Sequence, residues 1–336
     1  MRLAEHLGSN PSVEELRYVK QLGVTDVVTG PPVPPVTLPP QYHFLARYIP
    51  PEQLEPQVWE FLPLVTLRKR IEDAGLRHAV IEANPPMDRI ITGRSGRDEQ
   101  IENLKKTIRN MGAAGIPILA LHFMALGVWR TSWEIPERGG ATVNGFDYEL
   151  VKNAPLTPLG VITEEQMWDN LEYFLKRVMP VAEEARVKIG FHPDDPPISP
   201  IAGVARILRS PEAFKRLIEL VPSDYLGLEF CQGCFCEMGI DVTEAIRYFG
   251  SRRKIFFVHF RNVVGNPAKF HETFHDNGQT DMLKAMIAYR EVGFDGPMRP
   301  DHYPKVEGDT PWMHRSRAYA LGYVRGLMQA AGFPLA

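Results

Sequence analysis

Apolar and polar positions alternate along this chain in a repeating order. Short apolar runs are separated by longer segments in which apolar residues recur every three or four positions. Short apolar runs are typical of parallel strands buried on both faces, and amphipathic segments are typical of the helices that cover them. The pattern predicts strands at residues 2–7, 24–29, 78–83, 118–123, 187–192, 225–230, 254–260 and 296–300.

Capping residues mark the helices between these strands. Ser12 and Thr163 each precede an amphipathic segment, and glycines follow several others. Alternating strands and helices favour a (β/α)₈ TIM barrel, and we expect a single domain over residues 1–336. The predicted helices cover residues 13–23, 64–76, 98–115, 164–185, 210–220, 241–250, 280–293 and 315–332.

Two inserts interrupt the alternation, at residues 29–56 and 127–160. The first is rich in proline and must be extended or irregular, and the second carries many aromatic and charged residues. Both follow predicted strands, so both belong to the face of the barrel that carries active sites. A linker is the alternative for the first insert, but we favour a lid or a subunit contact; the second could serve either role.

Composition and charge exclude several classes of protein. The formal net charge is −3 and no basic cluster stands out, which argues against a nucleic-acid partner. No stretch approaches the ~18 consecutive apolar residues of a membrane span, and the N-terminus has no apolar signal core. We therefore expect no membrane association, a cytoplasmic location and a small-molecule substrate.

Metal-binding residue types recur where four late strands end. His192 closes one strand, Cys231 directly follows the next, His259 lies near the end of a third, and Asp301 follows the last. The carboxyl ends of barrel strands meet at one mouth. Each residue alone could be a buried structural side chain, but two imidazoles, a thiolate and a carboxylate together suffice for a divalent transition metal.

The cysteines all lie within residues 231–236. A cluster of three thiols resembles a soft-metal site, but such a site normally needs a second pair of cysteines, and the chain has none. We expect Cys231 to be a ligand, with Cys234 and Cys236 on a loop beyond it as bystanders.

Further polar residues follow the same strands. Arg261 and Asn262 follow His259, Arg299 precedes Asp301, and residues 271–276 supply two histidines and two acids. A cationic, histidine-rich mouth suits an anionic sugar acid, because guanidinium groups pair with carboxylates. An internal ion pair is the alternative for Arg299, and a solvated loop is the alternative for His271 and Glu272.

Four segments carry a resemblance to a known family. "GFHPDDPP", "VHFRNV", "FHETFHDNGQTDM" and "GFDGPMRPDH" closely resemble motifs of the mannonate dehydratases, enzymes with a xylose-isomerase-like barrel. The resemblance runs from about Ser12 to Leu327. It implies dehydration of D-mannonate, or a related aldonic acid, to 2-keto-3-deoxy-D-gluconate in hexuronate catabolism, with a divalent ion, most often Mn²⁺; Fe²⁺, Co²⁺ or Mg²⁺ are alternatives.

The resemblance also assigns roles to residues. It implies that His192, Cys231, His259 and Asp301 are the metal ligands and that His302 transfers protons, and it matches Arg261, Glu272 and His275 to family positions. We expect His302, His275 and Glu272 to be catalytic. The residues that we expect to bind substrate are Arg261, Asn262, Arg299, His122 and Trp312. The chain departs from the family at "CQGC", where the family has Cys-Thr-Gly-Ser, and at His122, where the family has Asn. Trp312 aligns with a tyrosine thought to act in catalysis, and indole cannot transfer that proton.

Two rival functions stay open at this point. The same barrel could hold a metal-dependent sugar or sugar-acid isomerase or epimerase, or a non-catalytic protein that binds sugar acids. In the dehydratase, the metal would stabilise negative charge and His302 would transfer protons. Asp194 or Asp195 could orient His192 from behind. Barrels of this kind often form homo-oligomers, so we expect a dimer or a larger assembly.

Overall fold

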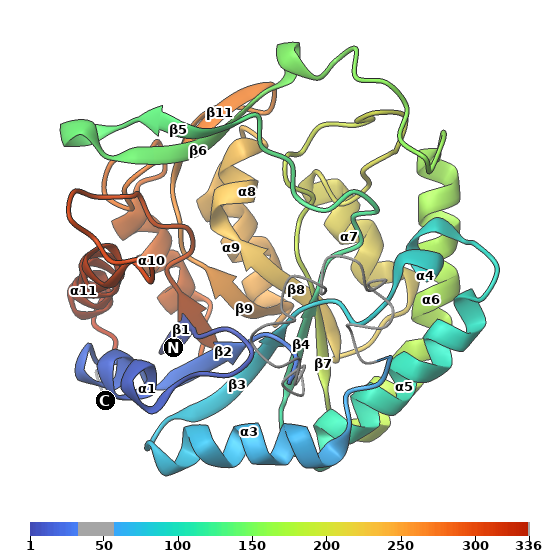
Figure 1. The fold of residues 1–336 in the computed structure, drawn as a ribbon, viewed down its shortest axis with the longest axis horizontal. Coiled ribbons are helices and arrows are strands. Elements are labelled where there is room, and N and C mark those ends of the chain that lie inside the picture. Colours follow the sequence, from blue (N-terminus) through green and yellow to red (C-terminus); the bar gives the residue numbers. More distant parts are fainter. Residues whose placement is uncertain (33–56, 335–336) are drawn as a thin grey trace, which may run out of the picture.

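Eight parallel strands close into a barrel. The computed structural model describes residues 1–32 and 57–334, and the strands pair in the order β1-β12-β9-β8-β7-β4-β3-β2 (Figure 1). Every strand expected from the apolar runs is present, and the predicted TIM barrel is confirmed. The barrel strands are β1 (Arg2–His6), β2 (Asp26–Thr29), β3 (Arg77–Glu82), β4 (Ile118–Leu121), β7 (Lys188–Phe191), β8 (Leu226–Cys231), β9 (Ile255–His259) and β12 (Pro297–Arg299).

Helices surround this barrel in the predicted places. Ser12 caps α1 through a capping box, in which its side chain accepts from Glu15 N and the Glu15 carboxylate accepts from Ser12 N. Thr163 and Gln166 form the same arrangement at the start of α6. The predicted helices are α1 (Val13–Gln21), α3 (Phe61–Asp73), α5 (Arg97–Ala113), α6 (Glu164–Ala185), α7 (Pro211–Leu220), α9 (Val242–Ser251), α10 (Met282–Glu291) and α11 (His314–Ala330).

Two short helices, α4 (Asp88–Thr92) and α8 (Gln232–Glu237), were not expected from the sequence. The second corrects the placement of two cysteines. Cys234 and Cys236 lie inside α8, not on a loop, because the chain turns into a helix directly after Cys231. Both side chains are buried.

A small antiparallel sheet, in the order β10-β11-β6-β5, was also not foreseen. β5 (Ser132–Pro136) and β6 (Thr142–Asp147) come from the insert at 127–160, and β10 (Val263–Asn266) and β11 (Lys269–Glu272) follow barrel strand β9. Both hairpins leave the carboxyl ends of barrel strands, so this sheet lies over the mouth, across the barrel from α3 (Figure 1). His271 and Glu272 are therefore strand residues. The proline-rich insert falls almost wholly outside the described residues.

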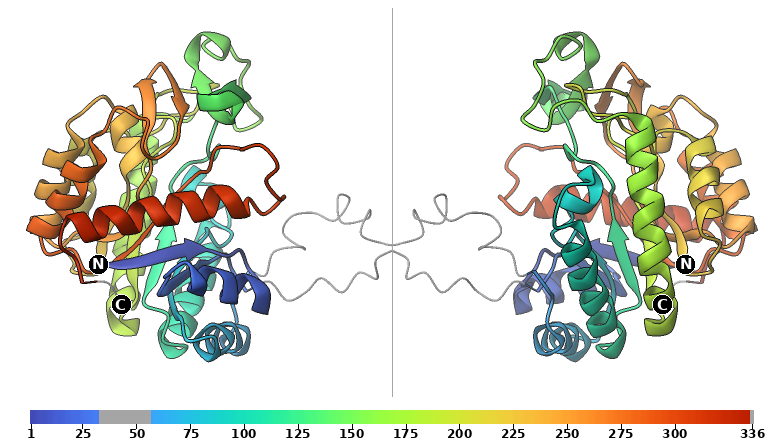
Figure 2. Two further views of the ribbon diagram at one scale, coloured as in Figure 1. Left: turned by 90° about the vertical axis from the view of Figure 1, so that its left-hand side faces the viewer. Right: turned by 90° about the vertical axis from the view of Figure 1, so that its right-hand side faces the viewer.

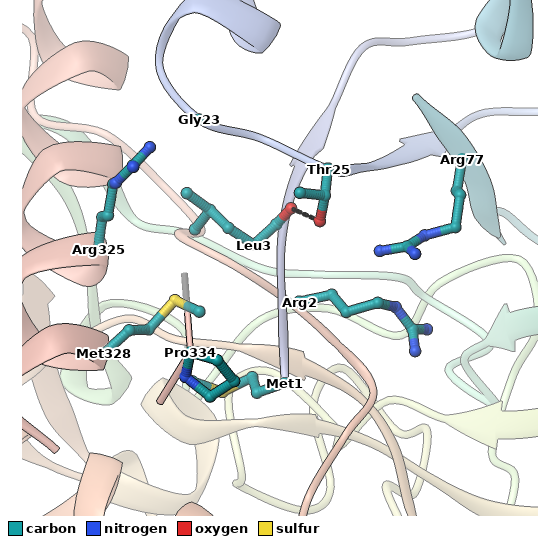
Figure 3. Close-up of a pocket in the computed structure, with 9 residues that line it drawn as sticks. All are labelled: Met1, Arg2, Leu3, Gly23, Thr25, Arg77, Arg325, Met328 and Pro334. Carbon is teal, nitrogen blue, oxygen red and sulfur yellow. Dashed lines mark hydrogen bonds between the residues drawn. The ribbon is translucent and has the colours of Figure 1, made fainter. Parts of the chain in front are cut away.

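A small pocket lies at the opposite end of the barrel, with a volume of about 60 Å³. Figure 3 shows its lining, which includes Leu3, Thr25 and Arg77 near the starts of β1, β2 and β3, and Met328 of α11. A space of this size holds a few water molecules and no sugar acid. Figure 2 shows the chain termini near this end, where β1 begins and α11 finishes.

Within residues 1–32 and 57–334, no helix combines the length and the apolar character needed to cross a bilayer.

His78 of β3 is buried in the barrel, and its Nε2 lies 2.9 Å from Oγ1 of Thr29. Burial, with a smaller contribution from Arg68, lowers the pKa of His78 to about 3. The unfolded chain therefore takes up a proton below pH ~6.5 that the folded chain refuses until about pH 3. Stability must fall as the pH drops through this window.

We predict that this effect disappears in His78→Gln. Between pH 7.5 and 5.0 the free energy of unfolding of the wild type should fall by about 2 kcal/mol more than that of the variant. Urea denaturation at a series of pH values measures the difference. Thr29→Val, which keeps the buried imidazole, should retain the wild-type slope; equal slopes for His78→Gln and wild type would contradict the assignment.

Candidate active site at the carboxyl ends of the strands

Side chains from four consecutive barrel strands meet at the mouth. His192 follows β7, Cys231 ends β8, His259 ends β9, and Asp301 lies two residues after β12. Strand pairing places these strand ends at a similar level along the barrel axis, because Cys231 is in register with His259, and His259 is in register with Arg299. The structure thus brings together the residues that the sequence analysis assigned to a metal.

Three of these residues lie close enough together to share a metal ion. One donor atom from each of His192, Cys231 and His259 lies within 4.8 Å of the other two. Donor atoms around one divalent transition metal lie at most about 4.5 Å apart, since each bond is about 2.0–2.3 Å long. Small side-chain adjustments would therefore let these groups share one ion.

Asp301 lies beside the same group, with Oδ2 3.4 Å from Nδ1 of His259. This separation is what two ligands about 2.1 Å from a tetrahedral metal would have. The buried ring of His259 is surrounded by carboxylates, since its Nε2 also lies 3.3 Å from Oε2 of Glu82. Imidazole and carboxylate together are a common ligand pair for divalent transition metals.

Neighbouring groups orient both imidazoles. Nδ1 of His192 lies 2.6 Å from the carbonyl oxygen of Pro193, which can only accept, so Nδ1 carries the proton and Nε2 is left for a metal. Nε2 of His259 lies 2.8 Å from Oε1 of Glu229, which leaves Nδ1 facing Asp301. The expectation that Asp194 or Asp195 orients His192 is wrong, because Pro193 occupies that position.

Electrostatics favour the thiolate form of Cys231. Burial alone would raise its pKa, but the Cys234 thiol, Arg261 and His192 outweigh burial and hold the pKa well below its usual range. The thiolate raises the pKa of His192 to about 9, against the effect of burial. The thiolate is the form of cysteine that binds metals.

Arg261 fills a second cluster of ligand-type residues beneath the mouth. Asp195, Cys234 and Glu237 come within 4.8 Å of one another. The buried Arg261 guanidinium contacts them at 3.0, 3.2 and 2.9 Å and reaches Asp301 at 3.2 Å. A cation therefore already occupies this cluster, and Arg261 acts as an internal partner of carboxylates.

His302 forms the other half of the mouth. Its Nδ1 hydrogen-bonds to Oε1 of Glu272, and its Nε2 lies 3.6 Å from Oδ2 of Asp301. Its backbone φ is +53°, in the left-handed region that non-glycine residues rarely adopt. Strain of this kind persists where the surroundings enforce it, often at functional sites. The imidazole thus presents Nε2 toward the predicted metal ligands.

His275 lies deeper in the same region. Its ring is buried, and burial lowers its pKa to about 4, so the imidazole is neutral at neutral pH. The ring of Tyr303 is 6.2 Å away, and the Tyr303 hydroxyl donates to Glu5 at 2.6 Å. Tyr303 thus lies near the mouth, whereas Tyr319 is 43% exposed beside Phe274.

Three of the residues predicted to bind substrate have partners within the protein. Asn262 is buried, and its amide is bonded to the backbone of Val263 and Thr280. Trp312 packs on Tyr18 and under Arg317. Arg299 contacts Glu82 and Asp301, both at 2.9 Å, which matches the internal ion pair considered from the sequence.

His122 instead lines open space. It borders a groove of about 1040 Å³ together with Asn84, Met124 and residues of α4. Burial, followed by His192 and Arg206, lowers the pKa of His122 to about 4. The groove is large enough for a sugar acid.

Sequence reasoning missed Arg130, and it missed Glu82 and Glu229, which form a third group of ligand-type residues with His259, within 4.8 Å of one another. Glu229 carried a readable signal, since it is a carboxylate inside an apolar run, two positions before Cys231 and hence on the same side of the strand. No sequence signal pointed to Arg130, because its contacts depend on the path of the insert at residues 127–160.

Comparison with known proteins points in one direction. The family model described as D-mannonate dehydratase (UxuA) matches residues 1–160 and 156–332. Mannonate dehydratase of Streptococcus pneumoniae (strain 70585) is 35% identical over 306 residues, covering 82% of this chain and 83% of that protein. The Thermotoga maritima enzyme is 34% identical over 313 residues, covering 82% and 87%.

Solved structures agree. The crystal structure of mannonate dehydratase from Streptococcus suis serotype 2 superposes with a TM-score of 0.86 at 32% identity, covering 100% of this chain and 97% of that chain. A xylose isomerase domain protein from Planctomyces limnophilus matches with a TM-score of 0.61 at 14% identity, covering 98% and 97%. At that identity the likeness shows only a shared barrel.

We predict that Cys231→Ser loses metal affinity. Removing an outer partner of a metal ligand typically costs about 10–100-fold in affinity, so removing the thiolate itself should cost at least about 100-fold. Titration of metal-free protein with Mn²⁺, with elemental mass spectrometry of the dialysed protein, measures this. Cys236→Ser in α8 is the matched control and should bind as the wild type does; retention of full affinity by Cys231→Ser would remove the thiolate from the site.

Proposed function

The chain belongs to the mannonate dehydratase family, and on this basis we propose how its own residues dehydrate D-mannonate. It is a sugar-acid dehydratase, a hydro-lyase. The observation that carries the proposal is the convergence of His192, Cys231, His259 and Asp301 with His302 at one mouth.

The reaction removes one water molecule. D-Mannonate loses the proton on C2 and the hydroxyl on C3, and the resulting enol tautomerises to 2-keto-3-deoxy-D-gluconate. The C2 proton is weakly acidic beside a carboxylate, and hydroxide is a poor leaving group. The enzyme must therefore stabilise negative charge and supply a base and an acid.

A divalent metal fits the four ligands and would supply Lewis-acid stabilisation of the developing charge. We propose Mn²⁺, because the family resemblance favours it and a mixed set of N, S and O donors suits a divalent transition ion. Arg299 and Arg261 hold Asp301 in place from two sides, at 2.9 and 3.2 Å. Glu229 keeps the His259 ring turned so that Nδ1 faces the ligand group.

His302 is the proposed proton-transfer residue. The Glu272 carboxylate accepts the proton on Nδ1, which leaves the Nε2 lone pair facing the metal ligands, where substrate would bind. The same nitrogen, once protonated, can return a proton to the departing hydroxyl. His275 is neutral and buried nearby, and we propose that it shapes the site beside Tyr303.

Substrate would enter through the groove bordered by His122 and Asn84. We propose that His122 contacts substrate hydroxyl groups as a neutral donor or acceptor. Arg261, Asn262 and Trp312 are held by internal partners, so we propose that they support the site from behind. Arg299 is 7% exposed and would bind substrate only through the edge left free by Glu82 and Asp301.

The rival functions receive less support. The epimerase and isomerase structures that share this barrel are 11–16% identical to the chain, against 32–35% for several mannonate dehydratases. A binding protein without catalysis would not need the hydrogen bond that fixes the tautomer of His302.

We also propose a homo-oligomer and a cytoplasmic location. Support for an oligomer comes from apolar side chains exposed on neighbouring helices, namely Val13 of α1 at 64% and Leu62 of α3 at 70%, beside a groove of about 600 Å³ between α1 and α3. Exposed apolar patches commonly mark contacts between subunits.

We predict that His302→Gln abolishes most turnover of D-mannonate while leaving the metal bound. Loss of a general acid-base residue typically costs about 10²–10⁴-fold in rate. Mass spectrometry of the product should show the loss of one water in the wild type. A product of unchanged mass would identify an isomerase or epimerase, and near-normal kcat in the variant would exclude His302 as the proton-transfer residue.

A further inference from the structure

We propose that Arg130, on the insert that leads into the small sheet, is a positioning residue for both reacting groups of the mouth. It holds Glu272, and through it His302; it also holds Asp195, and through it Arg261 and Asp301. The inference rests on the proposed roles of His302 and Asp301.

The contacts of Arg130 are made inside the protein. Its side chain is 1% exposed, and Nη2 donates to Oε1 of Glu272 and to Oδ2 of Asp195, both at 2.8 Å, while Nη1 donates to Oδ1 of Asp195. Oε1 of Glu272 is the same atom that bonds Nδ1 of His302. One guanidinium therefore sits directly behind the carboxylate that sets the tautomer of the proposed proton-transfer residue.

The second branch leads to the metal ligands. Oδ2 of Asp195, which accepts from Arg130, also contacts Nη2 of Arg261 at 3.0 Å, and Nε of Arg261 lies 3.2 Å from Asp301. Alternating positive and negative groups thus connect residue 130 to one ligand and to the proton-transfer histidine. A single arginine links three segments that follow barrel strands, since Asp195 follows β7, Glu272 ends the hairpin after β9 and Arg130 follows β4.

Only arginine can make this set of contacts. The guanidinium is planar, stays charged and offers five donors in a fixed fork, so it can bind one carboxylate through paired bonds and still reach a second. A lysine ammonium provides the charge without the geometry. Arg130→Lys should therefore keep the fold and lose the alignment of Glu272.

Arg138 provides a matched control on the same insert. It is also an arginine paired with a carboxylate, Asp276, but its side chain is 44% exposed, and its other partner is the exposed Tyr319 of α11. Exposed pairs of this kind contribute little to stability. Arg138→Lys changes the same chemistry outside the mouth.

The experiment compares Arg130→Lys, Arg130→Ala and Arg138→Lys in metal-loaded enzyme with D-mannonate as substrate. Bound metal, thermal midpoint, kcat and KM are measured for each. We expect kcat to fall about 10–100-fold in both Arg130 variants, with KM changed less than threefold and metal retained, and no change in Arg138→Lys. Guanidinium chloride at millimolar concentration should restore part of the activity of Arg130→Ala and none of that of Arg130→Lys.

Other outcomes would overturn the inference. An unchanged kcat in folded, metal-loaded Arg130→Lys would show that His302 does not need this support. Activity that falls only in proportion to bound metal or folded protein, without rescue by guanidinium, would reduce Arg130 to a structural ion pair. Failure of the proposed mechanism would give a different result. His302→Gln would then keep its kcat, whatever the kcat of the Arg130 variants.

Discussion

Buried ion pairs between arginines and carboxylates hold the mouth of this barrel together. Arg130 and Arg261 share Asp195, and their remaining contacts reach Glu272, Glu237 and Asp301. Removing such charges from water costs several kcal/mol per ion, which only dense mutual pairing offsets. Burial alone would raise the pKa of Asp195, but Arg130 and Arg261 hold it well below its usual range. The network is thus an arrangement in which each charge is held in place by its neighbours.

This constraint explains why the small sheet matters to the chemistry. Its two hairpins follow barrel strands β4 and β9, and these segments bring Arg130 into contact with Glu272 above the barrel. The barrel supplies the predicted metal ligands from its strand ends, whereas the small sheet supplies the group that orients His302. The proposed metal ligands and the carboxylate that orients His302 thus come from separate layers of the fold, joined by two guanidinium groups.

Much of this could be predicted from the sequence, because the decisive signals were local. Every barrel strand was predicted, most of them from short apolar runs, and the ligand-type residues at strand ends could be identified because parallel strands end at one face of the barrel. The hairpin β10–β11 was missed because its strands are only 4 residues long, and α8 because its sequence, "QGCFCE", has weak helix propensity. The role of Arg130 was hidden, since its partners lie 65 and 142 positions away along the chain. Trp312, which aligns with the family tyrosine, packs on Tyr18 and supplies no catalytic group. Tyr303, beside His275, lies nearer to the mouth.

The central claim is that His192, Cys231, His259 and Asp301 bind one divalent ion beside His302. Anomalous diffraction from crystals of this protein grown with Mn²⁺ tests it most directly. The account predicts a single strong peak within bonding distance of His192, Cys231, His259 and Asp301, with Arg261 still between Asp195 and Glu237. A peak held by Glu82 and Glu229, or one that displaces Arg261 from Asp195, Cys234 and Glu237, would contradict it.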